Sequence, residues 1–292
     1  MIETSVLRAG DSILHVRSRG AEPVGWSVDG RELLWPGGTA WARSSPILFP
    51  IVGRAAEGRI RVGDASYAIG THGFAADEAF VVTSSCKDAL SLRLSDTAST
   101  RAQYPFAFEL EVSYLLTPRD VTASFQVSNP GDTAMPYALG FHPGFRWPFS
   151  SEAAVGHLLE FEEEEAGWVP EISDKGLFTN RRRAVPLDGR QLAITPDLMS
   201  REALCFLDAK STSLRFVAPS GEAIAVETTG FPHLALWSRP PAPFLCMECW
   251  TGHGDKEGYR GELADKPSMR ILAAGASARH AVRWHFENPC QE

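Results

Sequence analysis

The stretch Phe108-Glu-Leu-Glu-Val-Ser-Tyr-Leu115 alternates apolar and polar residues along most of its length. In an extended chain its leucine, valine and tyrosine point to one face, whereas the two glutamates and the serine point to the other. Residues 121–128 repeat the pattern, and the Asn129-Pro-Gly-Asp132 segment that follows has the residues typical of a turn. Both segments are therefore predicted to be half-buried strands that pair as antiparallel neighbours.

Short runs of the same kind recur along the chain, at residues 12–18, 79–84, 90–95, 213–217, 223–228, 234–238, 269–272 and 279–286. Helical periodicity is nearly absent, and 25 glycines and 20 prolines punctuate the sequence. These features predict an all-β fold, an antiparallel sandwich or barrel, rather than a parallel α/β sheet. No internal repeat is evident, and no linker rich in proline, serine or glycine divides the chain, so residues 1–292 are expected to form a single domain.

The composition restricts the class of partner and the compartment. The 292 residues carry a formal net charge of −8, which provides no broad basic field, so a small neutral ligand is expected rather than nucleic acid. The segment Met1–Arg8 has a charge where a signal peptide would have its apolar core. No later run is long and apolar enough to cross a bilayer, so we expect a cytoplasmic protein without membrane contact.

Five cysteines, an odd number, do not suggest a secreted disulfide framework and are expected to be free thiols. Cys246-Met-Glu-Cys249 has the C-x-x-C spacing of metal and redox sites, but residues 244–250 have the composition of a strand. Residues three apart in a strand point to opposite faces, so neither zinc binding nor redox pairing is expected of these two thiols.

Two runs of like charge stand apart from the alternating segments, Glu162–Glu165 and Arg181–Arg183. Like charges adjacent in sequence ordinarily spread into water, so both runs are predicted to be solvated loops. An acidic cation site and an anion-binding patch are the alternatives. Residues 152–196 are the least regular part of the sequence and are expected to make a long excursion over one face.

Four largely apolar segments each contain an ionisable side chain that a plain core would not need. They are Pro46–Arg54 with Arg54, Thr71–Phe74 with His72, Gly140–Phe145 with His142, and Cys246–Trp250 with Glu248. Burying a charged or titratable group alone is costly, so the four side chains are predicted to converge on one another or on a polar ligand. Taken singly, Arg54 also fits a structural ion pair, and His72 fits a loop histidine that donates to a carbonyl.

His142 and Glu248 are the stronger candidates. Gly140 and Pro143-Gly144 fix the backbone on both sides of His142, as is common where a strand end presents a reacting group. Glu248 interrupts a run that otherwise has the composition of a fully buried strand. Its carboxylate must therefore have partners or a raised pKa.

These segments, in this order, resemble the aldose 1-epimerase (galactose mutarotase-like) superfamily, particularly its bacterial branch of shorter chains with uncertain substrates. The matching segments are Leu48–Arg54, His72–Ala75, Tyr104–Phe106, Asn129-Pro130, Met135–Tyr137, Gly140–Phe145, Leu234–Trp237, Phe244–Gly252 and Lys266. The resemblance implies a large antiparallel β-sandwich, the supersandwich of that superfamily, with a sugar site in a cleft on one face. It also implies interconversion of the α and β anomers of a hexose without a cofactor or metal.

Mapped onto this chain, the resemblance makes Glu248 the general base and His142 the general acid. Arg54 and His72 fall on sugar-contacting positions that also stabilise charge, and Trp250 or Trp237 could stack on the sugar. The chain departs from the family at two places. Cys249 stands where the family commonly has proline, and Glu202 falls near the position of a substrate-binding aspartate, with Asp208 as the poorer candidate. The identity of the sugar is therefore less well defined than the reaction at C1.

Two other functions remain open at this stage. A hexose-6-phosphate 1-epimerase would use additional phosphate contacts, for which Arg54, Arg59 and Arg61 are the candidates. A sugar-binding protein that kept the fold and lost the chemistry is the alternative from another class, although it would not need both His142 and Glu248. The expected partner is a small-molecule sugar, and the chain is expected to be a monomer or a homodimer in carbohydrate metabolism.

Overall fold

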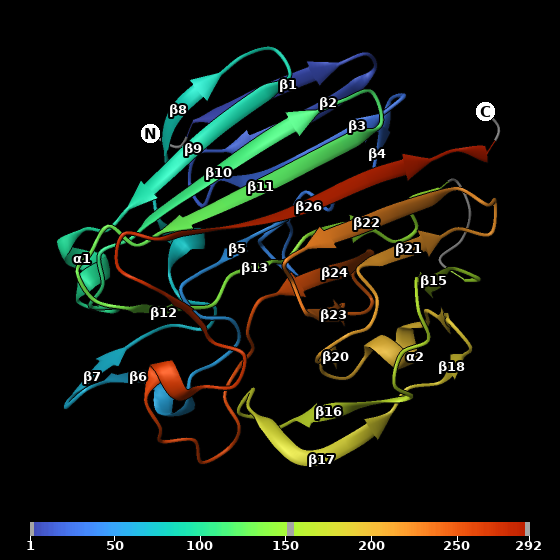
Figure 1. The fold of residues 1–292 in the computed structure, drawn as a ribbon. Helices are drawn as coiled ribbons and strands as arrows, with labels where there is room; N and C mark the ends of the chain where they lie inside the picture. Colours follow the sequence, from blue (N-terminus) through green and yellow to red (C-terminus); the bar gives the residue numbers. More distant parts are fainter. Residues whose placement is uncertain (1–2, 151–154, 290–292) are drawn as a thin grey trace.

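Antiparallel sheets dominate the computed structural model of the chain, which describes residues 3–150 and 155–289 (Figure 1). The largest sheet has ten strands. In spatial order they are β18 (Leu187–Asp188), β19 (Gln191–Ala193), β15 (Leu158–Phe161), β21 (Ser213–Val217), β22 (Ala223–Thr229), β26 (Ser277–Glu287), β11 (Asp120–Ser128), β10 (Glu109–Leu116), β9 (Ala89–Ser95) and β8 (Val81–Ser85). The predicted all-β fold is confirmed, as is the antiparallel pairing of β10 with β11.

A six-stranded sheet lies below the ten-stranded one in Figure 1. It consists of β20 (Leu204–Phe206), β23 (His233–Trp237), β24 (Phe244–Trp250), β13 (Gly140–Phe141) and β5 (Ile47–Leu48), with β14 (Gly144–Arg146) also paired to β24. A four-stranded sheet contains β1 (Thr4–Ala9), β2 (Ser12–Arg17), β3 (Glu22–Val28) and β4 (Arg31–Glu32).

The remaining strands form three two-stranded sheets. They are β6 (Arg59–Val62) with β7 (Ala65–Ala68), β12 (Met135–Tyr137) with β25 (Arg270–Leu272), and β16 (Trp168–Ile172) with β17 (Phe178–Ala184). Helical structure in the described residues is limited to α1 (Ala98–Arg101), α2 (Pro196–Met199) and the 3₁₀ turns η1 (Ala56–Gly58), η2 (Ala75–Asp77) and η3 (Leu263–Asp265). None of these helices is long and apolar enough to span a membrane.

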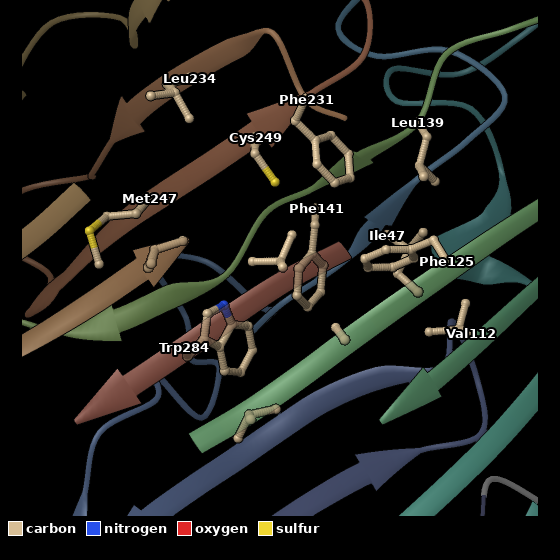
Figure 2. Packing of buried hydrophobic residues seen from close by; sticks show 14 of the residues in the cluster. Ile47, Val112, Phe125, Leu139, Phe141, Phe231, Leu234, Met247, Cys249 and Trp284 are labelled. Atoms are coloured by element: carbon tan, nitrogen blue, oxygen red, sulfur yellow. The ribbon is translucent and has the colours of Figure 1, made fainter. Parts of the chain in front are cut away.

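Aromatic side chains fill the space between the two largest sheets (Figure 2). Trp284 of β26 stacks on Phe141 of β13, with ring centroids 5.3 Å apart and planes within 7°. Phe125 of β11 packs against the same Phe141 ring at 5.3 Å, and Phe145 of β14 meets Trp284 edge-on. This packing holds β13 against the ten-stranded sheet, and β13 is the strand that leads into His142.

Two predictions from the charge runs and the irregular segment are wrong. Residues 155–196 are not a plain excursion: β15, β18 and β19 extend the ten-stranded sheet, and β16 and β17 form a hairpin, while residues 152–154 lie outside the described residues. Arg181–Arg183 belongs to β17 rather than to a loop. Glu162–Glu165 is a loop, as predicted, with its first three residues exposed; Glu165 is buried, and its carboxylate accepts hydrogen bonds from the backbone N–H groups of Lys210 and Ser211.

The cysteine predictions hold where the structure describes them. Cys86, Cys205, Cys246 and Cys249 are free, and Cys290 lies outside the described residues. Across residues 3–150 and 155–289, no group of three or more His, Cys, Asp or Glu side chains is arranged to hold a metal ion.

Candidate active site

The six predicted site residues all line one cavity of about 390 Å³. They come from five separate parts of the sequence and are Arg54, His72, His142, Glu202, Glu248 and Trp250. Such convergence of titratable groups on one concave surface is typical of an active site.

Glu248 lies on the face of β24 that borders this cavity. It is only 2% exposed, and Trp250, two residues further along the strand, shares its face. Its Oε2 accepts a hydrogen bond from the indole Nε1 of Trp250 at 3.1 Å. Met247 and Cys249 occupy the opposite face and belong to the main hydrophobic core (Figure 2). The period of two along the strand therefore divides β24 into a reactive face and a packing face.

His142 follows β13 and faces the carboxylate directly. Its Nε2 lies 3.2 Å from Glu248 Oε1, and its backbone N–H donates to the Pro46 carbonyl. Gly140 allows this approach, because a Cβ there would lie 2.9 Å from Cδ1 of Trp250. The two residues that the sequence placed at the centre of the chemistry thus lie side by side, with their side-chain N and O atoms 3.2 Å apart.

Burial shifts the two groups in opposite directions. It raises the pKa of Glu248 well above the usual value, and the Trp250 N–H only partly opposes that shift. Burial, and then the nearby His72, lower the pKa of His142 well below the usual value. Both shifts disfavour the charged form of the group concerned. In the absence of a ligand, the pair is therefore most stable with one proton on Glu248, a neutral His142 and no net charge.

His72 lies in the same cavity with a fixed tautomer. Its backbone has a φ of 66°, and its Nδ1 accepts a hydrogen bond from the Gly53 N–H at 3.1 Å. Burial, and then the Arg54 charge, lower the pKa of His72 to about 4. The ring is therefore neutral near pH 7, and its hydrogen sits on Nε2, where it can be donated to an oxygen.

Arg54 stands at a more exposed part of the cavity and is held by the 173–176 turn. Its Nη1 donates to the Lys175 carbonyl at 3.1 Å, and a Cβ on Gly176 would lie 2.9 Å from the Arg54 Cδ. Its backbone carbonyl accepts from the N–H of Asp255, whose side chain pairs with Lys266 at 2.6 Å in a buried site. The arginine is therefore anchored at its backbone and near its guanidinium.

The aldose 1-epimerase family matches residues 6–280. The chain belongs to this family. It is 31% identical to the chromosomal protein LacX of Lactococcus lactis over 265 residues, which cover 86% of this chain and 88% of LacX.

Two solved structures of family-like proteins superpose on nearly the whole chain. A galactose mutarotase-like protein from Lactobacillus casei is 26% identical with a TM-score of 0.91, covering 98% of this chain and 100% of that one. A galactose mutarotase related enzyme from Lactobacillus acidophilus is 25% identical, also with a TM-score of 0.91, and 99% of each chain is covered. The galactose mutarotase-like fold is therefore shown.

Of the two acidic candidates for the substrate-binding position, one lies in the cavity and the other does not. Glu202 lines the cavity in the segment before β20. Asp208 does not line it; its side chain is 86% exposed and lies 3.8 Å from Nδ1 of His233. Of the two acids, only Glu202 is placed to meet a ligand beside Glu248.

Trp250 lines the cavity, but little of its ring is exposed for stacking on a sugar. Its ring is 5% exposed, and its indole N–H is engaged by Glu248. Trp237, the other candidate, meets the His142 ring edge-on with centroids 5.7 Å apart. Trp250 therefore contacts Glu248 through a hydrogen bond, and Trp237 contacts His142 through packing.

Trp41 is a site residue that the sequence did not reveal. Its ring stacks on His142, with centroids 5.0 Å apart and planes within 30°, and it lines the cavity. It fits because Gly144 has no side chain: a Cβ there would lie 2.7 Å from the Trp41 Cζ3. Trp41 stands outside any strand, in a loop without periodicity, so the pattern of the sequence carried no signal for it.

Proposed function

We propose that this protein is an aldose 1-epimerase that interconverts the α and β anomers of an aldose by acid–base ring opening. The observation that carries the proposal is the buried pair of Glu248 and His142, 3.2 Å apart on the wall of a cavity large enough for a monosaccharide. Membership of the epimerase family supports the reaction class.

In the proposed reaction, Glu248 removes the proton of the C1 hydroxyl while the bond between C1 and the ring oxygen breaks. His142 delivers a proton to that ring oxygen, which leaves an open-chain aldehyde. After rotation about the C1–C2 bond, His142 takes the proton back from the hydroxyl as it attacks the opposite face of C1. Glu248 returns its proton to the new C1 oxygen, so the cycle consumes no proton.

The reactive form of the pair is the carboxylate with the imidazolium. It differs from the neutral form only by moving one proton across the 3.2 Å contact. The Trp250 N–H favours the carboxylate, and a sugar hydroxyl that donates to Glu248 would favour it further.

Arg54 and His72 are proposed to stabilise the negative charge that develops on the sugar oxygens. The His72 tautomer with its hydrogen on Nε2 is a neutral donor, and Arg54 is a permanent cation at the same cavity. Donors that are already oriented before the reaction contribute most in a site shielded from water.

The proposal is tested by measuring anomer exchange for glucose, galactose and other aldoses with saturation-transfer NMR. Glu248→Gln and His142→Asn should each slow the exchange by roughly 10²–10⁴-fold. Glu222→Gln and His280→Asn are matched controls, because both side chains are buried or nearly so and neither lines the cavity. Wild-type protein that binds an aldose without accelerating exchange would instead be a sugar-binding protein.

Two of the three arginines considered as phosphate contacts give no support to a hexose-6-phosphate 1-epimerase. Arg59 donates to Ser66 and Arg61 donates to Glu57, and neither is among the residues that line the cavity. Of the three arginines, Arg54 alone reaches it.

We further propose a single domain that works in the cytoplasm as a monomer or homodimer. The free thiols of Cys86, Cys205, Cys246 and Cys249 support a reducing compartment.

A further inference from the structure

A second hollow of about 850 Å³, here called the arginine annex, adjoins the catalytic cavity. The two share six lining residues, which are Arg54, Ile172, Asp174, Glu202, Ala203 and Trp237. The annex is therefore the neighbouring hollow that a substituent of a sugar bound beside Glu248 would meet.

The annex has the opposite charge balance from the rest of the chain. Five arginines line it, with only three carboxylates, in a protein whose formal net charge is −8. One carboxylate, Glu171, is already paired with Arg181 at 2.6 Å and lies 3.9 Å from Arg201. Positive charge is thus concentrated at the end of the cavity away from the catalytic pair.

Arg183 is an annex arginine whose guanidinium is not fully paired. Its Nη2 is buried and has no hydrogen-bond partner among the described residues. Burial, and then the neighbouring Arg201 charge, lower the pKa of the Arg183 guanidinium. The charges of Glu171 and Glu202 only partly oppose this shift. An anion in the annex beside Arg183 and Arg201 would stabilise the charge of both guanidinium groups.

Strand alternation directs this arginine into the annex. Arg181 and Arg183 line the annex from one face of β17. Arg182, between them, lies outside the annex with its Cζ 3.5 Å from the Trp168 ring centroid. Of the three arginines, Arg183 is therefore the partly buried one, whereas Arg181 lines the annex with a side chain that is 75% exposed and Arg182 lies on the other face of the strand.

We infer that the annex binds an anionic substituent of the sugar, a phosphate ester or a carboxylate, through Arg183 and Arg201, while C1 lies at Glu248 and His142. The inference rests on the proposed epimerase function and adds the substrate class to it.

Calorimetric titration of the whole protein tests the inference. The probes are glucose, glucose 6-phosphate and glucuronate, with inorganic phosphate as a competitor. The wild type should bind one of the anionic sugars about 10- to 100-fold more tightly than glucose, as expected for charge-assisted hydrogen bonds. The sugar that gains distinguishes a phosphate ester from a carboxylate.

Arg183→Gln should reduce the ratio of anionic to neutral sugar affinity to near one. Arg201→Gln should reduce it as well, and because the Arg201 side chain is 62% exposed, this variant remains informative if the loss of Arg183 prevents folding. Arg182→Gln removes the same charge from the outer face of the same strand and should leave the ratio unchanged.

Equal affinity for the neutral and anionic sugars in the wild type would overturn the inference. An equal loss of anionic-sugar affinity in Arg182→Gln and Arg183→Gln would also overturn it. The preference would then depend on the total positive charge of the protein rather than on a specific site. Anomer exchange by the same sugars separates this outcome from failure of the proposed function. Tight binding of an anionic sugar that depends on Arg183 but occurs without anomer exchange would contradict the epimerase function and support the anion site. Anomer exchange without a preference for anionic sugars would support the epimerase function and contradict the anion site.

Discussion

Glu248→Gln should make the protein more stable at neutral pH while it abolishes the proposed activity. The wild-type carboxyl is 2% exposed, and its contacts are His142 and the Trp250 N–H. Glutamine has nearly the same shape, accepts the same Trp250 hydrogen bond, and can donate to His142 Nε2. It carries no ionisable group whose burial opposes folding.

The size of the effect follows from proton linkage. Burial raises the pKa of Glu248 in the folded protein, so the folded state holds a proton that the unfolded state releases. The contribution of such a group is fully present below its unfolded pKa and is lost as the pH rises toward its folded pKa. Relative to the glutamine variant, the wild type should therefore lose about 1.4 kcal/mol of unfolding free energy per pH unit over that interval.

Urea denaturation of both proteins at pH 5, 6 and 7 measures this difference. From pH 5 to pH 7 the advantage of Glu248→Gln should grow by about 3 kcal/mol for as long as the folded carboxyl keeps its proton. Glu32→Gln, at an exposed position on β4, reports the general effect of removing one negative charge. A stability difference between wild type and Glu248→Gln that does not change with pH would refute the protonated, buried state of Glu248.

Trp250→Phe removes the N–H donated to Glu248 and should lower kcat about 10- to 100-fold in the anomer-exchange assay; an unchanged kcat would contradict the positioning role. The pH profile of kcat/KM should be flat through neutrality, with its acid limb below the usual histidine pKa of about 6.5, because burial lowers the pKa of His142. A midpoint at or above that value would be inconsistent with a buried neutral ring. Gly73→Ala should cost at least about 2 kcal/mol in urea denaturation, because its φ is 75° and the new Cβ would lie 2.2 Å from the Phe49 carbonyl oxygen.

Local periodicity explains which parts of the fold could be predicted. The segments 108–115 and 213–217 have one polar and one apolar face within their own residues, and the structure contains strands at both places. The pairing of β10 with β11 was also predictable, because a short turn joins them. In contrast, β26 lies between β22 and β11 in the ten-stranded sheet, and β11 is distant from it in sequence. Such partners depend on tertiary packing that no local pattern records.

The candidate site also has residues that the sequence could predict and residues that it could not. An acid within an apolar strand and a histidine between glycines are anomalies visible in the sequence, and Glu248 and His142 meet in the structure at 3.2 Å. Trp41 and the glycine that accommodates it are each ordinary in sequence and become informative only through their contact. Likewise, the role of Trp250 depends on the direction of its N–H, which composition does not specify.

The departure of this chain from the common family pattern at Cys249 can now be located on the molecule. Cys249 is 1% exposed on the core face of β24, between Leu234 of β23 and Phe141 of β13. It faces away from Glu248, so the change from the usual proline alters core packing and leaves the reactive face intact. Glu202 and the annex arginines, by contrast, lie where the distal end of a sugar would reach. Under the proposed function, the reaction depends on Glu248 and His142, so the identity of the sugar should depend on Glu202 and the annex arginines.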